Sequence, residues 1–294
     1  MTVVGAYCGS HGAIMMTREA DAPRRQRDSI YSAFARVGAE IAALEPDAVL
    51  IIGTDHGRIY TWDLVPSFVL GVGDQAQGIG EAGTPEVTWP MHGDVARAVL
   101  TGALTQNIDM SYSEVMRIDH SFVTPMLLMG LDKSIPIVPL MSNCNAPPIP
   151  SPVRYLRIGQ VIGETLEALP QRVVLIGTGG LSHWVGDPAR REFLRRPAGT
   201  RWRDADKHAM VLPDTGPING EFDNELLSAL RDGRAAQFAA DWPEERIEAE
   251  AGNGAQEIRN WLLVAAAVPR WRAQVLSYEQ VGQWLTGSAI VSFT

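Results

Sequence analysis

Short apolar runs rich in valine and isoleucine alternate along this chain with longer stretches of helical periodicity. The apolar runs predict β-strands over residues 2–8, 48–53, 67–71, 135–140 and 172–177. Between the first two runs, apolar positions recur at intervals of four and three and so share one helical face: Ile30, Phe34, Val37, Ile41 and Leu44. Strands that alternate with amphipathic helices are typical of an α/β fold.

Four more segments have helical periodicity, over residues 94–104, 153–169, 222–230 and 255–268, and Pro269 ends the last of them. Residues 197–220 are rich in glycine, proline and polar side chains. They predict a long loop, and loops of that length are commonly lids or specificity elements. No linker-like segment divides the 294 residues, so we expect a single domain.

Composition narrows the classes of function. The 46% hydrophobic and 20% charged content is that of a folded protein, and the net charge of -9 disfavours a nucleic-acid partner. No positively charged segment precedes the first apolar run, and no stretch approaches the roughly 20 apolar residues that a membrane span needs. The two cysteines, Cys8 and Cys144, are too few for a disulfide framework. We therefore expect a cytoplasmic protein without a membrane anchor.

Four of the six histidines share one context, in which an apolar run ends, small or acidic residues follow, and a histidine comes next. These are His11 in Gly-Ser-His, His56 in Thr-Asp-His, His120 in Ile-Asp-His and His183 in Gly-Leu-Ser-His. Because ligand-binding loops converge at the carboxyl ends of strands, we expect the four side chains to meet there in one active site. His92 and His208 lack the context and are expected on the surface.

A cluster of four imidazoles can divide between metal binding and proton transfer, because imidazole binds iron and zinc and titrates near neutral pH. Glu257 shares a helical face with Trp261 and Val264, and a carboxylate on an apolar face is costly unless it is paired or bound to a metal. Equally, its charge could stabilise the start of the helix. Glu248 and Glu250 lie in a polar segment that looks solvated. Two histidines and one carboxylate form the ligand set of many non-haem Fe(II) oxygenases.

Two aspartates directly precede histidines of this set. Asp55 comes before His56, and Asp119 comes before His120. Either carboxylate could orient an imidazole ring through a hydrogen bond, or it could cap a turn, and the sequence leaves both roles open.

Several longer motifs together resemble the class III extradiol dioxygenases, the family that includes the protocatechuate 4,5-dioxygenase β subunit and the 2,3-dihydroxyphenylpropionate 1,2-dioxygenases. The resemblance covers nearly the whole chain, and its middle and C-terminal parts are more similar to the second branch. It rests on the segments IDHSF at 118–122, GLDK at 130–133, LIGTGGLSH at 175–183 and AGNGAQEIRNW at 251–261. The 197–220 loop matches neither branch.

The resemblance implies a catalytic domain over residues 1–294, with a central mixed sheet flanked by helices. It implies that His11, His56 and Glu257 bind Fe(II), that His183 is the acid–base residue, and that His120 is a second histidine beside the substrate. The implied reaction is extradiol cleavage of a catecholic ring with both atoms of O₂ incorporated. A homo-oligomer is expected, or an assembly with a small partner subunit.

Three other interpretations fit parts of this pattern. An aminophenol could replace the catechol as substrate, since nothing in the motifs distinguishes the two. A zinc hydrolase could use the same ligands to activate water, but it gives His120 and His183 no necessary task. A non-catalytic protein on the same fold would be expected to have lost at least one of the five residues, and all five are present.

Overall fold

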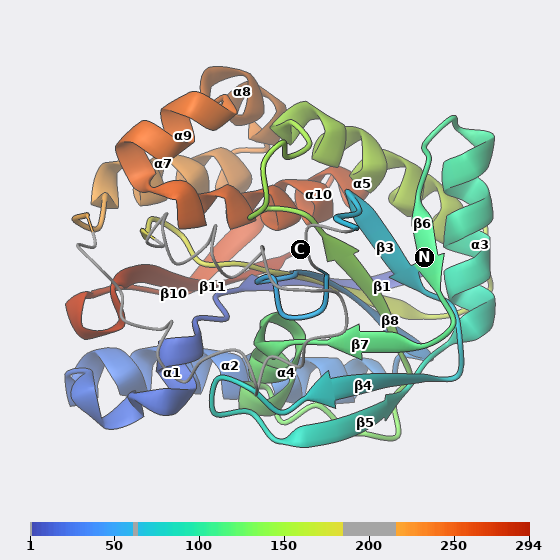
Figure 1. The fold of residues 1–294 in the computed structure, drawn as a ribbon, viewed down its shortest axis with the longest axis horizontal. Helices are drawn as coiled ribbons and strands as arrows, with labels where there is room; N and C mark the ends of the chain where they lie inside the picture. Colours follow the sequence, from blue (N-terminus) through green and yellow to red (C-terminus); the bar gives the residue numbers. More distant parts are fainter. Residues whose placement is uncertain (1, 61–63, 185–215) are drawn as a thin grey trace.

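The computed structural model describes residues 2–60, 64–184 and 216–294. In these ranges an eight-stranded mixed sheet runs through the middle of the molecule, in the order β10-β11-β1-β9-β2-β8-β3-β6 (Figure 1). Its strands are β1 (Val3–Gly9), β2 (Ala48–Thr54), β3 (Phe68–Gly71), β6 (Ser111–Ser113), β8 (Ile137–Ser142), β9 (Val173–Thr178), β10 (Ala273–Val281) and β11 (Thr286–Phe293). Strands β1, β9, β2 and β8 are parallel neighbours, so their carboxyl ends lie at one edge.

A second, three-stranded sheet lies beside the first, in the order β5-β4-β7. Its strands are β4 (Gln75–Ile79), β5 (Glu86–Pro90) and β7 (Met116–Ile118). Strands β4 and β5 form an antiparallel hairpin, and β7 pairs in parallel with β4. None of these three strands was predicted from the sequence, although His120 comes two residues after the end of β7.

Helices cover both faces of the large sheet. Figure 1 shows α5 and α10 with α7 to α9 above it, and α1, α2 and α4 with the small sheet below it. The bounds are α1 (Ala13–Thr17), α2 (Arg24–Leu44), α3 (Gly93–Thr105), α4 (His120–Leu128), α5 (Pro152–Glu167), α7 (Gly220–Arg231), α8 (Ala235–Asp241), α9 (Glu244–Ala251) and α10 (Arg259–Ala267), with 3-10 turns at Glu19–Asp21, Asn253–Ile258 and Gly282–Trp284. Each face of the sheet has its own hydrophobic core, and alternate residues of β2 contribute to one or the other. Leu50 belongs to the core that includes α5, and Ile51 belongs to the core that includes α2.

The elements predicted from the sequence are largely confirmed. All five expected strands form within two residues of their expected bounds, and the helices at 94–104, 153–169 and 222–230 form as α3, α5 and α7. The prediction of one helix over 255–268 is wrong, because Asn253–Ile258 is a 3-10 turn and α10 begins only at Arg259. Most of the 197–220 loop lies outside the described residues, which resume at Gly216.

None of the helices in the described ranges is both long and apolar enough to cross a bilayer. The two cysteines, Cys8 and Cys144, are free and buried.

Close contact between α5 and α10 depends on a glycine. A Cβ added to Gly159 would lie 2.1 Å from the carbonyl oxygen of Leu263, so α10 must move to admit alanine. We expect Gly159→Ala to lower the free energy of unfolding by about 1–3 kcal/mol, since overpacking outweighs the gain in helix propensity. Thermal unfolding measures this, with Gly282→Ala as the control because a Cβ there meets nothing within 4 Å. Equal melting temperatures for the two variants would contradict the expectation.

Candidate active site

The four histidines singled out by sequence converge at the carboxyl edge of the two sheets. His11 follows β1, His56 follows β2 and His183 comes after β9, while His120 opens α4 directly after β7 of the small sheet. Ring centroids lie 5.2 Å apart for His11 and His56 and 4.1 Å apart for His56 and His120, which are stacked. The structure therefore brings together side chains that are far apart in sequence.

Glu257 joins this cluster at the end of the 3-10 turn before α10. Its side chain is buried, and its Oε2 accepts a hydrogen bond of 2.8 Å from the backbone N–H of Gly180. Oε2 lies 3.0 Å from Nε2 of His11, and Oε1 lies 3.0 Å from Nε2 of His56. The carboxylate lies among imidazoles, just before the start of α10. Glu248 and Glu250 are exposed, as expected.

The hydrogen bonds of His11 leave one ring nitrogen free. The hydroxyl of Thr178 donates to the carbonyl of Ile52, so its oxygen is left to accept from Nδ1 of His11 at 3.0 Å. Nδ1 therefore carries the hydrogen, and Nε2 presents a lone pair. That Nε2 is buried without a hydrogen-bond partner, although a carboxylate oxygen lies 3.0 Å away.

His56 is held in the same tautomer by Asp119. One carboxylate oxygen of Asp119 lies 2.9 Å from Nδ1 of His56 and accepts from its backbone N–H at 3.0 Å. Burial opposes a charge on His56, but Asp119 and Glu257 outweigh it and raise the pKa of His56 well above its ordinary value. A cation, whether a proton or a metal ion, is therefore favoured at Nε2.

This donor set fits a divalent metal. Two imidazole nitrogens and one carboxylate point to a common place. Nε2 of His11 and Oε2 of Glu257 are both buried acceptors, and at 3.0 Å they repel each other unless a cation lies between them. Ligands about 2.1 Å from a metal and at right angles are about 3.0 Å apart, which is the separation observed. Burial raises the pKa of Glu257, but His11 and His56 outweigh it and hold that pKa well below its usual value. The residues present can hold a metal.

A second combination of donors is also close enough. One ring nitrogen each from His11, His56 and His120 lie within 4.8 Å of one another. These three imidazoles are therefore an alternative ligand set, in which His120 replaces Glu257.

His183 is oriented by the backbone. Its Nδ1 lies 2.8 Å from the carbonyl oxygen of Leu181, which can only accept, so Nδ1 carries the hydrogen. Nε2 then faces the cluster, 4.0 Å from Oε2 of Glu257, and in the neutral ring it is a proton acceptor. Added Cβ atoms at Gly180 and Gly254 would lie 2.6 Å and 2.2 Å from the ring. Because Gly180 and Gly254 have no Cβ, they leave the space that the imidazole of His183 occupies.

The two aspartates that the sequence left open have different roles. Asp55 caps a turn, accepting from the backbone N–H groups of Arg58, Ile59 and Tyr60 at 2.8–3.1 Å, and burial with the nearby Asp119 raises its pKa to about 6. Asp119 orients a ring, but the ring belongs to His56 and not to the neighbouring His120. It also caps α4 through the N–H of Ser121.

Two residues of the site were not singled out from the sequence. Glu81, at the tip of the β4–β5 hairpin, binds the ring and backbone of His120, and Arg58 lies beside it. The only sign of Glu81 in the sequence was an acidic residue in a short segment between Gly80 and Gly83. Of the remaining histidines, His92 is half-buried and caps α3, and His208 lies outside the described residues.

The family model described as the catalytic LigB subunit of aromatic ring-opening dioxygenase matches residues 5–289. The chain belongs to this family. Membership confirms the resemblance that the motifs carried, and with it an extradiol ring-cleaving dioxygenase acting on catecholic rings.

Curated relatives cover almost the whole of this LigB-family chain. A 2,3-dihydroxyphenylpropionate/2,3-dihydroxicinnamic acid 1,2-dioxygenase of Klebsiella pneumoniae (strain 342) is 30% identical over 294 residues, with 91% of each chain covered. A protein of the same name from Rhodococcus sp is 28% identical and covers 98% of this chain and 97% of its own. The crystal structure of an uncharacterized protein from Escherichia coli K12 covers 99% of both chains with a TM-score of 0.61, and at 13% identity it supports the fold alone.

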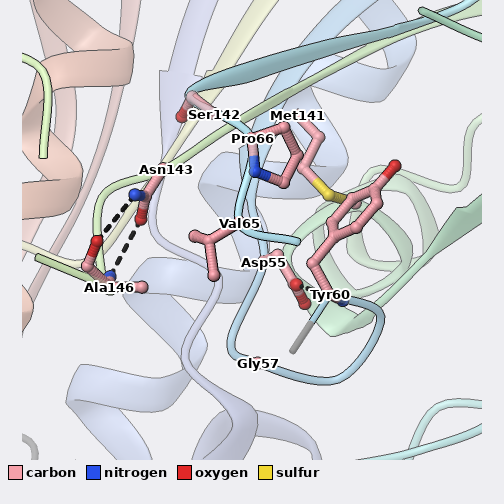
Figure 2. Close-up of a pocket in the computed structure, with 9 residues that line it drawn as sticks. All are labelled: Asp55, Gly57, Tyr60, Val65, Pro66, Met141, Ser142, Asn143 and Ala146. Carbon is pink, nitrogen blue, oxygen red and sulfur yellow. Dashed lines mark hydrogen bonds between the residues drawn. The ribbon is translucent and has the colours of Figure 1, made fainter. Parts of the chain in front are cut away.

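A small pocket lies beside the histidine cluster of this LigB-family chain, where β2 and β8 end (Figure 2). Its wall mixes apolar and polar side chains: Asp55, Gly57, Tyr60, Val65, Pro66, Met141, Ser142, Asn143 and Ala146. Figure 2 shows Asn143 turned toward Ala146, with which its amide exchanges hydrogen bonds of 2.7 and 2.8 Å. The pocket wall contains no lysine, arginine or histidine among the described residues.

Proposed function

We propose that this chain is an Fe(II)-dependent extradiol dioxygenase in which His11, His56 and Glu257 bind the metal and both atoms of O₂ enter the product. The observation that carries the proposal is the convergence of two Nε2 lone pairs and one carboxylate, with both nitrogen–oxygen distances at 3.0 Å. Two histidines and one carboxylate are the ligand set of many non-haem Fe(II) oxygenases, and a metal held by only three protein ligands would have positions free for substrate and O₂.

Bound Fe(II) would hold the catechol and O₂ within bonding reach of each other and pass electron density between them. The remaining chemistry belongs to two histidines. The lone pair on Nε2 of His183 takes a proton from a catechol hydroxyl as the substrate binds, because its Nδ1–H is already committed to Leu181. Nε2 of His120, a lone pair in the neutral ring, takes up a proton released by the substrate and returns it when the ring opens. Thr178 and Asp119 keep the two metal histidines in the tautomer that leaves Nε2 unprotonated.

A zinc hydrolase is the second candidate, and one observation favours it. The ring nitrogens of His11, His56 and His120 are close enough for a three-histidine zinc site. The carboxylate of Glu257 argues for the first proposal, because its two oxygens each face a different metal histidine. An aminophenol differs from a catechol only in having an amino group in place of one hydroxyl, so the same site could take either ring.

The proposal extends to the setting of the enzyme. We infer that it acts in the cytoplasm, which two free cysteines support, and as a homo-oligomer or with a small partner subunit, as the family resemblance implies. Substrates named for the relatives, dihydroxyphenylpropionate and dihydroxycinnamate, are the first catechols to test.

Oxygen uptake tests the proposal directly. Protein purified without oxygen and loaded with Fe(II) is given a panel of catechols and aminophenols while the absorption spectrum is followed. We expect stoichiometric uptake and a yellow ring-fission product, since cleavage beside the diol leaves a conjugated semialdehyde or keto acid. Zinc as the metal of the purified protein, with hydrolytic turnover that survives the removal of oxygen, would instead establish the second candidate.

A further inference from the structure

His120 is held by a carboxylate at the tip of the small sheet. Glu81 is 2% exposed, and its Oε1 accepts from the backbone N–H of His120 at 2.8 Å and from the ring Nδ1 as well. A carboxylate accepts and cannot donate while it is ionised, so Nδ1 of His120 carries the hydrogen. Nε2 is then the ring nitrogen left to face His11 and His56.

The turn that carries Glu81 has little freedom. Gly80 and Ala82 flank it with φ of 68° and 51°, a left-handed conformation that is unfavourable for alanine. The backbone N–H and the hydroxyl of Thr84 both donate to the carbonyl of Glu81, which closes the turn. The hairpin therefore presents this one side chain in a fixed direction.

The charge of Glu81 is balanced on its second oxygen. Nε of Arg58, from the turn that follows β2, lies 3.4 Å from Oε2, and both side chains are largely buried. A buried carboxylate is costly unless it is paired, so the position of Glu81 between a cation and an imidazole keeps it ionised. Burial raises the pKa of Glu81, but His120 outweighs it and the pKa lies below its ordinary value.

We propose that Glu81 is a positioning residue for proton transfer, which fixes the ring plane and the tautomer of His120 so that Nε2 faces the substrate. The inference rests on the proposed role of His120. Glu81 itself touches neither the metal ligands nor the reacting atoms and acts only through the histidine.

A double-mutant cycle in the Fe(II)-loaded full chain tests this. We expect His120→Ala and Glu81→Ala each to lower kcat by about 10²- to 10⁴-fold, with KM and iron content little changed. The double variant should be no slower than His120→Ala alone, because Glu81 has no task once the imidazole is gone. Glu81→Gln keeps an oxygen that can accept from Nδ1 and should recover most of the turnover. Glu114→Gln, at an exposed carboxylate just before β7 of the same small sheet, is the matched control and should turn over normally.

A spectroscopic readout separates orientation from folding. In the diamagnetic zinc-loaded protein, the nitrogen chemical shifts of the His120 ring should report hydrogen on Nδ1 in the wild type and in Glu81→Gln, and a tautomer mixture in Glu81→Ala. The inference would be overturned if the losses in kcat of the two single variants multiplied in the double variant. It would also be overturned if the His120 tautomer in Glu81→Ala were the same as in the wild type. If His120→Ala lowers turnover but Glu81→Ala does not, the inference about Glu81 is wrong, while the proposed function of the chain is unaffected. Normal His120→Ala would instead remove the proposed role of His120.

Discussion

Replacing Glu257 by alanine is expected to abolish stoichiometric iron binding. The carboxylate is the only charged donor that faces both Nε2 of His11 and Nε2 of His56 among the described residues. Loss of a residue that only orients a metal ligand typically lowers metal affinity about 10- to 100-fold, so loss of the ligand itself should lower the affinity further. Metal analysis after anaerobic Fe(II) loading and dialysis measures the effect, with circular dichroism to show that the variant folds.

Two further variants sharpen that result. Glu250→Ala removes an exposed carboxylate from the same polar stretch and should retain full iron. His120→Ala should also retain it, because in the proposed site this imidazole transfers protons and binds no metal. Full iron in Glu257→Ala together with lost iron in His120→Ala would establish the three-histidine site instead.

The second large effect is expected at His183. Replacing it by alanine should lower turnover about 10²- to 10⁴-fold, the usual worth of one general acid–base group. Iron content should stay at the wild-type level, because Nε2 of His183 lies 4.0 Å from Oε2 of Glu257 while the two proposed ligands lie at 3.0 Å. Turnover and metal content must be measured on the same preparation.

The control is a histidine outside the cluster. His92→Asn removes an imidazole but keeps a residue that caps helices well, so α3 and turnover should both be preserved. If loss of iron accounts for the whole defect of His183→Ala, then His183 is a ligand and its proposed role is wrong.

The strands that carry the site could be predicted from the sequence because they are buried on both faces. β2 and β9 read as unbroken apolar runs, and each leads into one of the predicted histidines. The small sheet was missed because its strands are three to five residues long and include glycine and glutamine. β11 was missed because its buried run contains threonine, glycine and serine.

Partners within the site could not be predicted, since they depend on how the two sheets pack. Asp119 lies next to His120 in sequence, yet its carboxylate binds His56, 63 residues away. Glu81 reaches His120 across 39 residues. Helical periodicity suggested Glu257 but left its role open, and only the distances to two imidazoles indicate a metal site.

The adjacent residues Asp119 and His120 join the two sheets at the start of α4. One fixes the ring of His56 on the large sheet, and the other is fixed by Glu81 on the small sheet. A shift of α4 would therefore move both anchors together, so the ring of the proposed metal ligand His56 and the ring of His120 cannot be reoriented independently from this helix.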